Sequence, residues 1–593
     1  METKKVLRGG EFLICNTTAD DIFIPEELNE EQIMIVQTCE DFLETEIFPN
    51  LDRIDSMEPG LMRELVRKAG NLGLLGISIP EELGGFDQSF LTSMRANETM
   101  GAAYSFAVAY MAHTGIGTLP LLYYGNDEQK HKYIPLLATG EYAAAYCLTE
   151  PGAGSDANAG KTSAVLSDDG KHYILNGQKM WITNGGFAEL QTVFAKIDND
   201  RVLSAFLVEK DFPGIVINPE EKKMGIKGSS TVQIFYNDVK VPVENLLGKR
   251  GEGYRIALNI LHIGRIKLGA TLLGSAKRVI KQSVNYAIER KQFGSSIANF
   301  GAIKYKMAQQ VIMTWVTESA VYRATKDVDN TIQEYLMKGL DKSKANIEGI
   351  SHYAIEAALM KVYGSEALDY VVDEAVQIFG GMGYSAEGPV DRAYRDSRIN
   401  RIFEGTNEIN RLLAVDTLIK RGMKGEIKLF EEIELVLADI KTIEIYTPSG
   451  NYYTDYQNYN NNFKKAILMV IGLASNHYDR KLETEQEISI NISDMMMYLY
   501  GSESTALRIE KLEKQKGTAY VAIYKDILDV YASDAAVSIY KNGIDAIASF
   551  LDEKDLKVYA QYLHMLTAIP VVNVKAARRR IADKLIDDNK YSF

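Results

Sequence analysis

Cysteine is scarce in this sequence, and its distribution supports no covalent or metal framework. The 593 residues include only Cys15, Cys39 and Cys147, which lie far apart and form no Cys-x-x-Cys pair. An odd and scattered set of this kind supports neither disulfides nor a thiolate metal site, and it is typical of a reducing compartment. The seven histidines never pair at helical ligand spacing, and no His-Glu-x-x-His motif occurs. We therefore expect no metal centre.

Long apolar runs are also missing, and basic residues are the minority charge. No run of about 18 apolar residues is present, and residues 1–16 lack the apolar segment of a signal peptide. The chain carries 66 Lys and Arg against 80 Asp and Glu, for a net charge of −14. Because such a balance repels phosphate backbones, we expect no nucleic-acid partner. The sequence predicts a cytoplasmic protein that does not span a membrane.

Two common catalytic motifs are absent as well. No Gly-x-Ser-x-Gly nucleophile elbow occurs, which argues against a serine hydrolase. The glycine-rich stretch 152–156 lacks the third glycine, the following helix and the downstream acid of a dinucleotide-binding unit. By itself this stretch predicts only a loop.

The pattern of apolar residues divides the chain into four regions. After Asn29 apolar residues recur every three to four positions, and Asn29 with Gln32 predicts a capping box. Between about 145 and 247 short β-branched and aromatic runs alternate with Gly, Asn and Asp turns, after which helical periodicity returns. We predict a mainly α fold with a central β domain, in the order helical 1–145, β 146–247, helical 248–422 and extra helical 423–593. A Tyr/Asn-rich segment near 446–462 lacks apolar periodicity and predicts a linker.

Three strings combine hydroxyl, aromatic, small and acidic residues at the ends of expected strands and in a basic stretch. They are CLTEPGAGSD at 147–156, NGQKMWITN at 176–184 and RIFEGTNE at 401–408. Thr149 and Thr183 could hydrogen-bond the polar edge of a planar cofactor, and Trp181 could pack on its rings or instead fill the β-domain core. Glu404 could be a reactive carboxylate or a solvated surface residue.

Together, and in this order, the strings resemble the acyl-CoA dehydrogenase family of flavoproteins. The similarity covers roughly residues 29–421 and includes RKQFG at 290–294, QIFGGMG at 377–383 and FEGT at 403–406. It implies a helical N-terminal domain, a β-barrel-like middle domain and a helical bundle of the four-helix type. Asn299-Phe-Gly301 and the extra residues 423–593 are similar to the very-long-chain subgroup.

The resemblance implies that FAD binds at residues from several motifs. The implied flavin contacts in the first two strings are Cys147, Leu148, Thr149, Gly154, Ser155, Trp181, Ile182 and Thr183. The positions that correspond to contacts with the FAD of a neighbouring subunit are Arg290, Gln377, Gly380 and Gly381. The cofactor site is completed by Thr406, Asn407 and Glu408. At least a homodimer is therefore implied.

The resemblance also makes Glu404 the catalytic base. It would take the α proton of an acyl-CoA thioester while flavin takes the β hydrogen as hydride, giving trans-2-enoyl-CoA. Some relatives carry the base on the earlier helix, but Gly264 occupies that position here. The implied substrate contacts are Ser155, Arg265 and Gly405, although Arg265 could instead cap a helix or form a salt bridge. Burial beside an acyl chain should raise the pKa of Glu404.

The implied partners are a medium- to very-long-chain acyl-CoA and an electron-transfer flavoprotein, in fatty acid β-oxidation. Two alternatives use the same residues, namely a flavin-dependent acyl-CoA oxidase and a family member that acts mainly in assembly. Gly115 and Gly117 could open a deep acyl channel or serve helix packing.

The C-terminal region has two interpretations. Lys464 and Lys465 precede the apolar run 466–473, and Lys575 with residues 578–580 forms a basic group. The apolar run is either a buried helix or a membrane-surface segment beside anionic headgroups. We expect the extra domain to limit assembly to a dimer, with weak peripheral contact at the inner face of the membrane as a second role.

Overall fold

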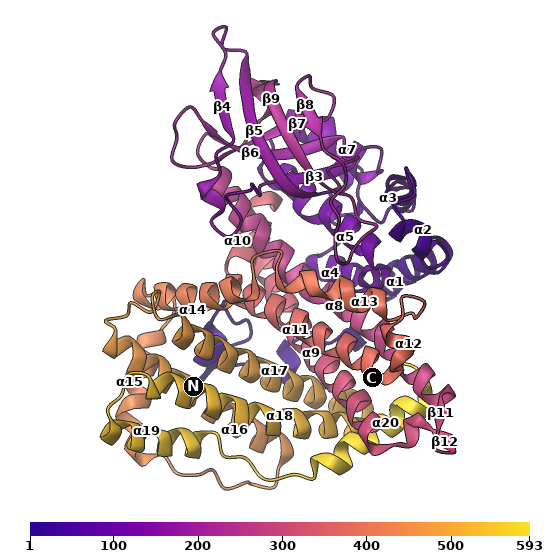
Figure 1. The fold of residues 1–593 in the computed structure, drawn as a ribbon. Coiled ribbons are helices and arrows are strands. Elements are labelled where there is room, and N and C mark those ends of the chain that lie inside the picture. Colours follow the sequence, from indigo (N-terminus) through magenta and orange to yellow (C-terminus); the bar gives the residue numbers. More distant parts are fainter.

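The computed structural model describes residues Met1 to Phe593 and shows a small β domain standing on a large helical body (Figure 1). The expected order of helical, β, helical and extra helical regions is confirmed. The N-terminal helices are α1 (Glu30–Phe42), α2 (Leu51–Asp55), α3 (Leu61–Asn71), α4 (Phe90–Met100), α5 (Ser105–Met111), α6 (Leu119–Tyr124) and α7 (Asp127–Ala138). The capping box at the start of α1 is confirmed, because the Asn29 side chain accepts from the Gln32 N–H and the Gln32 side chain accepts from the Asn29 N–H.

The β domain is one mixed sheet of eight strands. Its strands are β3 (Ala144–Cys147), β4 (Ser163–Leu166), β5 (His172–Thr183), β6 (Leu190–Ile197), β7 (Ser204–Glu209), β8 (Ile215–Ile217), β9 (Thr231–Pro242) and β10 (Leu246–Leu247). The order is β10-β7-β6-β4-β5-β9-β8, with β3 pairing in parallel with β6. The long pair β5 and β9 carries a register shift between Lys179 and Ile182, where two residues oppose one. Such a bulge turns a side chain out of the ladder, and here that side chain is Trp181.

Three long helices form the centre of the helical body. This region contains α8 (Gly253–Glu289), β11 (Lys291–Gln292), β12 (Ser295–Ser296), α9 (Gly301–Met337), α10 (Lys342–Ser351), α11 (Ala354–Phe379), α12 (Gly381–Tyr384), α13 (Asp391–Ser397) and α14 (Asn407–Met423). Helix α8 is long and apolar enough to cross a membrane by length and composition alone, and 78% of that apolar window is buried inside the protein. Its apolar side chains pack mainly against α11, α4 and α9.

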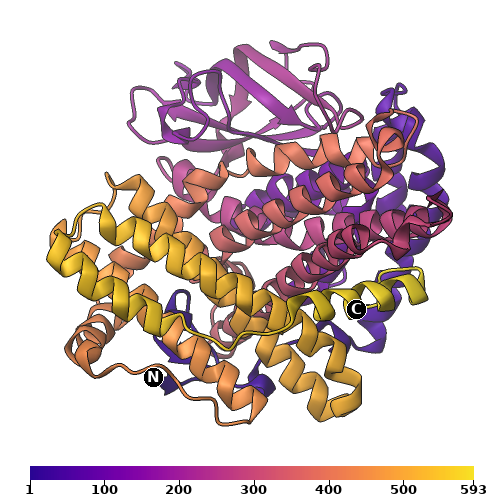
Figure 2. The ribbon, with the colours of Figure 1, turned by 60° about the horizontal axis from the view of Figure 1, so that its bottom comes forward.

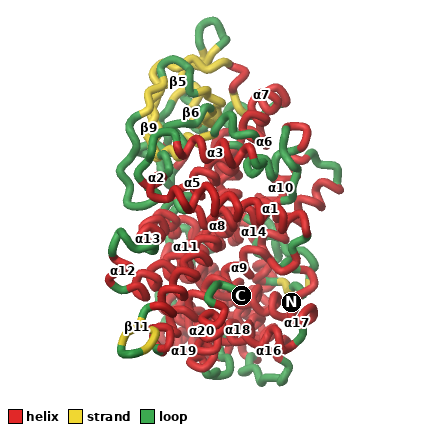
Figure 3. Tube along the Cα trace, turned by 90° about the vertical axis from the view of Figure 1, so that its right-hand side faces the viewer, coloured by secondary structure: helices red, strands yellow, loops and turns green.

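The extra domain is a set of helices packed against α9 and α14 (Figures 2 and 3). Its helices are α15 (Leu429–Asp439), α16 (Tyr452–His477), α17 (Gln486–Lys516), α18 (Thr518–Ala548), α19 (Glu553–Leu566) and α20 (Val574–Asp588). The linker expected over 446–462 is therefore wrong for most of its length, since α16 already begins at Tyr452. Tyr452 and Tyr456 both donate to Asp529 of α18, at 2.8 and 2.6 Å, so these tyrosines form a packed helix face.

The first 27 residues also differ from the expectation that they belong to the N-terminal helical domain. The short strands β1 (Glu2–Thr3) and β2 (Cys15–Asn16) lie against the extra domain, where Lys464 donates to the Cys15 carbonyl at 2.8 Å. Lys464 also pairs with Glu503 at 2.5 Å. Because pairing with a distant helix leaves no local pattern, periodicity along the chain could not place this segment.

The apolar run 466–473 of α16 lies inside the protein, which confirms the buried-helix interpretation. Every residue from Ala466 to Gly472 is buried, and so is the Lys464 side chain before it. The membrane-surface interpretation of this run is wrong, because its apolar side chains already contact α15, α17 and α18. The basic group is partly neutralised as well, since Arg578 pairs with Asp534 and Arg580 with Asp526.

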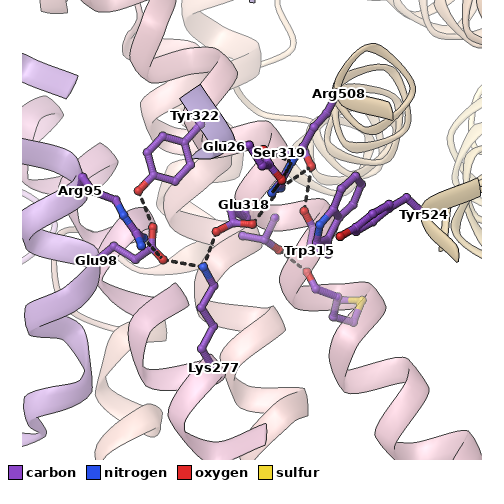
Figure 4. A network of polar contacts seen from close by, with 12 residues as sticks. Glu26, Arg95, Glu98, Lys277, Trp315, Glu318, Ser319, Tyr322, Arg508 and Tyr524 are labelled. Carbon is purple, nitrogen blue, oxygen red and sulfur yellow. Dashed lines mark hydrogen bonds and ion pairs between the residues drawn. The ribbon is translucent and has the colours of Figure 1, made fainter. Parts of the chain in front are cut away.

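A buried polar network joins the extra domain to α4, α8 and α9 (Figure 4). Arg508 of α17 donates to Glu318 of α9 at 2.8 Å and to Glu26 at 2.6 Å, while its guanidinium lies 4.2 Å from the Trp315 ring. Lys277 of α8 pairs with Glu318 and, at 2.6 Å, with Glu98 of α4. Burial raises the pKa of Glu318, but the two cations outweigh it and hold that pKa below its usual value. The network therefore joins four helices and the N-terminal segment around ionised groups.

Candidate active site

A cleft of about 760 Å³ lies where the β domain meets α8 and the segment before α14. Its walls bring together most of the site residues expected from the three strings, and Arg265 of α8 as well. Those that line the cleft are Leu148, Thr149, Gly154, Ser155, Trp181, Ile182, Thr183, Arg265, Glu404 and Gly405. Residues separated by more than two hundred positions in the chain therefore share one surface.

Trp181 presents its indole to this cleft. The bulge in β5 gives Trp181 a φ of 60° and leaves 53% of the residue exposed, so it does not fill the β-domain core. The hydroxyl-bearing residues Thr149 and Thr183 line the same wall. An exposed indole beside hydroxyl groups provides both stacking area and hydrogen bonds for a planar ring system. These residues fit the isoalloxazine of FAD.

Glu404 lies in a turn whose backbone carbonyls accept hydrogen bonds from buried side chains. Glu404 and Gly405 have φ values of 57° and 83°, a left-handed conformation that favours glycine. Arg265 donates from Nε to the Glu404 carbonyl at 3.0 Å, and Lys361 donates to the Gly405 carbonyl at 2.7 Å. Asn410 adds a 2.7 Å bond to the same Gly405 carbonyl. Buried donors thus stabilise a strained backbone next to the carboxylate.

The carboxylate of Glu404 is free to react. Its Oε2 atom is buried without a hydrogen-bond partner. Desolvation raises the pKa of Glu404 to about 7, although the nearby Arg265 and Lys361 cations oppose the shift. A Cβ atom added to Gly264 would lie 2.9 Å from Oε2. Glycine at that position therefore leaves room for the carboxylate of Glu404.

Lys361 was missed by sequence reasoning. Besides Gly405, its ammonium contacts the Asn407 side chain at 2.8 Å, and burial lowers its pKa to about 7. Asn407 in turn donates to Ser365 at 3.0 Å. The available signal was a single lysine within the apolar run 357–362 of α11, because a charge on a buried helix face requires a partner.

A second cavity, which we call the tunnel, continues from Glu404 into the helical body. It has a volume of about 100 Å³ and runs between the 101–116 segment, α8 and α11. Small residues such as Gly101, Ala107 and Gly115 line it. A Cβ on Gly115 would meet nothing within 4 Å, whereas one on Gly117 would lie 2.8 Å from Ala144. Gly115 therefore opens the tunnel, and Gly117 serves packing.

Other expected site residues do not line the cleft. Cys147 is buried in the β-domain core, where burial raises the pKa of its thiol to about 12. Thr406 caps α14, Asn407 is buried beneath the turn and Glu408 is exposed. The four residues expected at a neighbouring subunit are exposed on the helical body, away from the β domain, next to β11 and α12 (Figure 1); they are Arg290, Gln377, Gly380 and Gly381.

Comparison with known families gives the same order of domains. The family described as "Acyl-CoA dehydrogenase, N-terminal domain" matches residues 29–141. The families of the corresponding middle and C-terminal domains match residues 145–239 and 251–419. A further description that also reads "Acyl-CoA dehydrogenase, C-terminal domain" matches residues 462–565. The extra helices are therefore part of a recurrent arrangement.

Similar proteins span the chain at substantial identity. A probable acyl-CoA dehydrogenase of Bacillus subtilis (strain 168) is 41% identical over 587 residues, 99% of each chain. A crystal structure of an acyl-CoA dehydrogenase complexed with FAD from Bacillus anthracis is 43% identical, with a TM-score of 0.96 over 99% of this chain and 100% of that one. The very long-chain specific mitochondrial acyl-CoA dehydrogenase of Homo sapiens is 41% identical over 67% of this chain and 59% of its own length.

The fold and the cleft, with an exposed indole facing a buried carboxylate, define a flavin-dependent oxidoreductase. The chain belongs to the acyl-CoA dehydrogenase family, and its cofactor is FAD. The resemblance based on the motifs is thereby confirmed, including its extension to the very-long-chain subgroup.

Proposed function

We propose that this chain dehydrogenates a fatty acyl-CoA thioester between its α and β carbons, giving trans-2-enoyl-CoA. The observation that carries the proposal is the position of Glu404, which lines both the cleft and the tunnel. Thr183 and Phe403 also belong to both walls, so the two cavities meet at this carboxylate. A thioester bound across the junction would have its reacting carbons beside Oε2 and the Trp181 wall.

The residues of the site have different roles in such a reaction. Bound FAD supplies the acceptor for the β hydrogen. Glu404 accepts the α proton on Oε2, and a pKa near neutrality suits a group that must take up and release a proton. Arg265 and Lys361 hold the backbone of the turn while the carboxylate changes charge. Gly405, which lacks a side chain, leaves the backbone open to a thioester oxygen.

We propose a medium- to very-long-chain substrate because the tunnel is lined mainly by apolar and small residues. The human relative, which is described as very long-chain specific, supports this class. The resemblance further supports transfer of electrons to an electron-transfer flavoprotein and a place in fatty acid β-oxidation. We propose a cytoplasmic location because the few scattered cysteines are typical of a reducing compartment.

Anaerobic addition of a long-chain acyl-CoA to the purified holoenzyme is expected to bleach the visible absorbance of the flavin, because hydride transfer reduces it. Reduced enzyme should then be reoxidised faster by electron-transfer flavoprotein than by oxygen. Faster reaction with oxygen would favour the acyl-CoA oxidase. Protein that holds no FAD and turns over no acyl-CoA would instead indicate a role in assembly.

We also propose a homodimer whose contact surface includes the exposed end around β11 and α12. Phe293 is 94% exposed and Tyr384 is 90% exposed, and both lie close in sequence to residues that the resemblance places near a neighbouring FAD. Aromatic side chains are enriched at protein–protein interfaces, which supports a contact surface at this end.

Arg290→Ala is expected to weaken FAD retention and the dimer together, because one guanidinium would serve a phosphate across the interface. Loss of one charge-assisted contact should cost about tenfold in flavin affinity or more. The ratio of flavin to protein and the mass in solution measure the two effects. Arg250→Ala is the matched control, since Arg250 pairs with Asp200 on the β-domain surface. Flavin loss from an intact dimer would contradict the coupling, and an unchanged protein would contradict both roles.

A further inference from the structure

Lys267 is a buried lysine that lines the tunnel without a partner. It lies on α8 three residues beyond Gly264, about 4.5 Å further along the helix axis. Only 4% of the residue is exposed, and it forms part of the tunnel wall. The ammonium makes no salt bridge, and the Thr271 hydroxyl donates to the Lys267 backbone carbonyl, not to its side chain. Buried lysines in proteins are normally paired.

The other charged groups of the tunnel do not neutralise Lys267. Burial alone lowers the pKa of Lys267 to about 8, with no charged neighbour contributing, so the amine is mostly protonated at neutral pH. Asp396 is occupied on one oxygen by the Ile226 N–H, and burial raises its pKa to about 7. The pKa of Glu404 is lowered by the charges of Arg265 and Lys361, and Lys267 does not contribute.

The far end of the tunnel carries a second cation. Arg278 lies over the Phe48 ring at 3.5 Å and the Tyr104 ring at 5.6 Å, and it pairs with no carboxylate. The remainder of the wall is mainly apolar, with side chains such as Val108, Leu268 and Leu272. A hydrocarbon chain in this tunnel would desolvate Lys267 further without offering it an acceptor, which is unfavourable. An anionic group on the chain would satisfy the ammonium.

We propose that Lys267 binds a carboxylate on the acyl group, so that this protein prefers the mono-CoA thioester of a dicarboxylic acid to the hydrocarbon acyl-CoA of equal length. The inference rests on the proposed function, because it assigns the tunnel to the acyl chain. It assigns Lys267 as a specificity-determining residue that touches the substrate away from the reacting carbons.

The test is a ratio of kcat/KM values for matched thioesters. The holoenzyme is assayed with octanoyl-CoA and the mono-CoA thioester of octanedioic acid, and then with the twelve-carbon pair. The wild type should favour the carboxylated member of at least one pair. Lys267→Met keeps the length of the side chain and removes its charge, so it should lower the ratio at least about tenfold. Lys267→Arg should preserve the preference.

The controls separate this inference from its premise. Lys281→Met removes an exposed lysine of the same helix and should leave the ratio unchanged. A wild-type preference for hydrocarbon in both pairs would overturn the inference, and so would a ratio that Lys267→Met does not alter. The wild-type ratio decides the matter even if that variant fails to fold. Absence of flavin bleaching by every thioester would instead overturn the proposed function, and the inference with it.

Discussion

Glu404→Gln is expected to retain FAD and to bind acyl-CoA while losing about 100-fold or more of its turnover, the usual contribution of a positioned general base. Glutamine has the shape of glutamate, and the carbonyls of the turn keep their bonds from Arg265 and Lys361. The amide cannot take the α proton. The rate of anaerobic flavin bleaching in a stopped-flow experiment measures the loss. Near-normal bleaching by Glu404→Gln would refute the role of Glu404.

The pH dependence of the wild type provides an independent check on the same residue. Because the base must be ionised, kcat/KM should rise with pH through an apparent pKa of about 7 and then level off. The rise should be absent from the residual activity of Glu404→Gln. His262 is not the source of such a limb, since burial lowers its pKa to about 3. The Glu404→Gln comparison separates Glu404 from Lys361 and Asp396, whose pKa values also lie at about 7. A limb near the ordinary pKa of glutamate would show that the site does not desolvate Glu404.

Arg508→Met is expected to destabilise the protein by about 3–5 kcal/mol, because it leaves buried carboxylates short of a cation. Glu318 would keep only Lys277, and Glu26 would lose the guanidinium that now lies within 2.6 Å. These contacts join α17 to α9 and to the N-terminal segment (Figure 4). Thermal unfolding of the holoenzyme, read as Tm, measures the effect.

Arg580→Met is the matched control for Arg508→Met. Arg580 also pairs with an aspartate, Asp526 at 2.5 Å, but its side chain is 58% exposed. Exposed pairs of this kind contribute about 0–1 kcal/mol. Equal changes in Tm for the two variants would show that the buried network does not hold the extra domain in place. Truncation at Gly422 is a poor substitute for these variants, because it would uncover the apolar faces of α9 and α14 that pack on α17.

Local sequence patterns determined much of the architecture. Alternating β-branched runs indicated the β domain, and Asn29 with Gln32 indicated the start of α1, because strand periodicity and capping depend on neighbours in the chain. The same reasoning failed at 446–462, where Tyr452 and Tyr456 of α16 pack on α18 through Asp529 instead of forming a linker. Their partners lie some 70 residues away in the chain and left no periodic signal.

The sequence by itself determined the class of chemistry. The strings around Thr149, Trp181 and Glu404 are long, ordered and specific, so they identified the family and its cofactor. The strings identify the family because binding FAD and removing a proton require particular residue types at particular positions. Tertiary structure alone decided the environment of those residues: the unpartnered Oε2 of Glu404, the space that Gly264 leaves for that carboxylate and the isolation of Lys267 in the tunnel. Desolvation and charge pairing depend on which distant groups approach in space, and composition and periodicity do not encode that proximity.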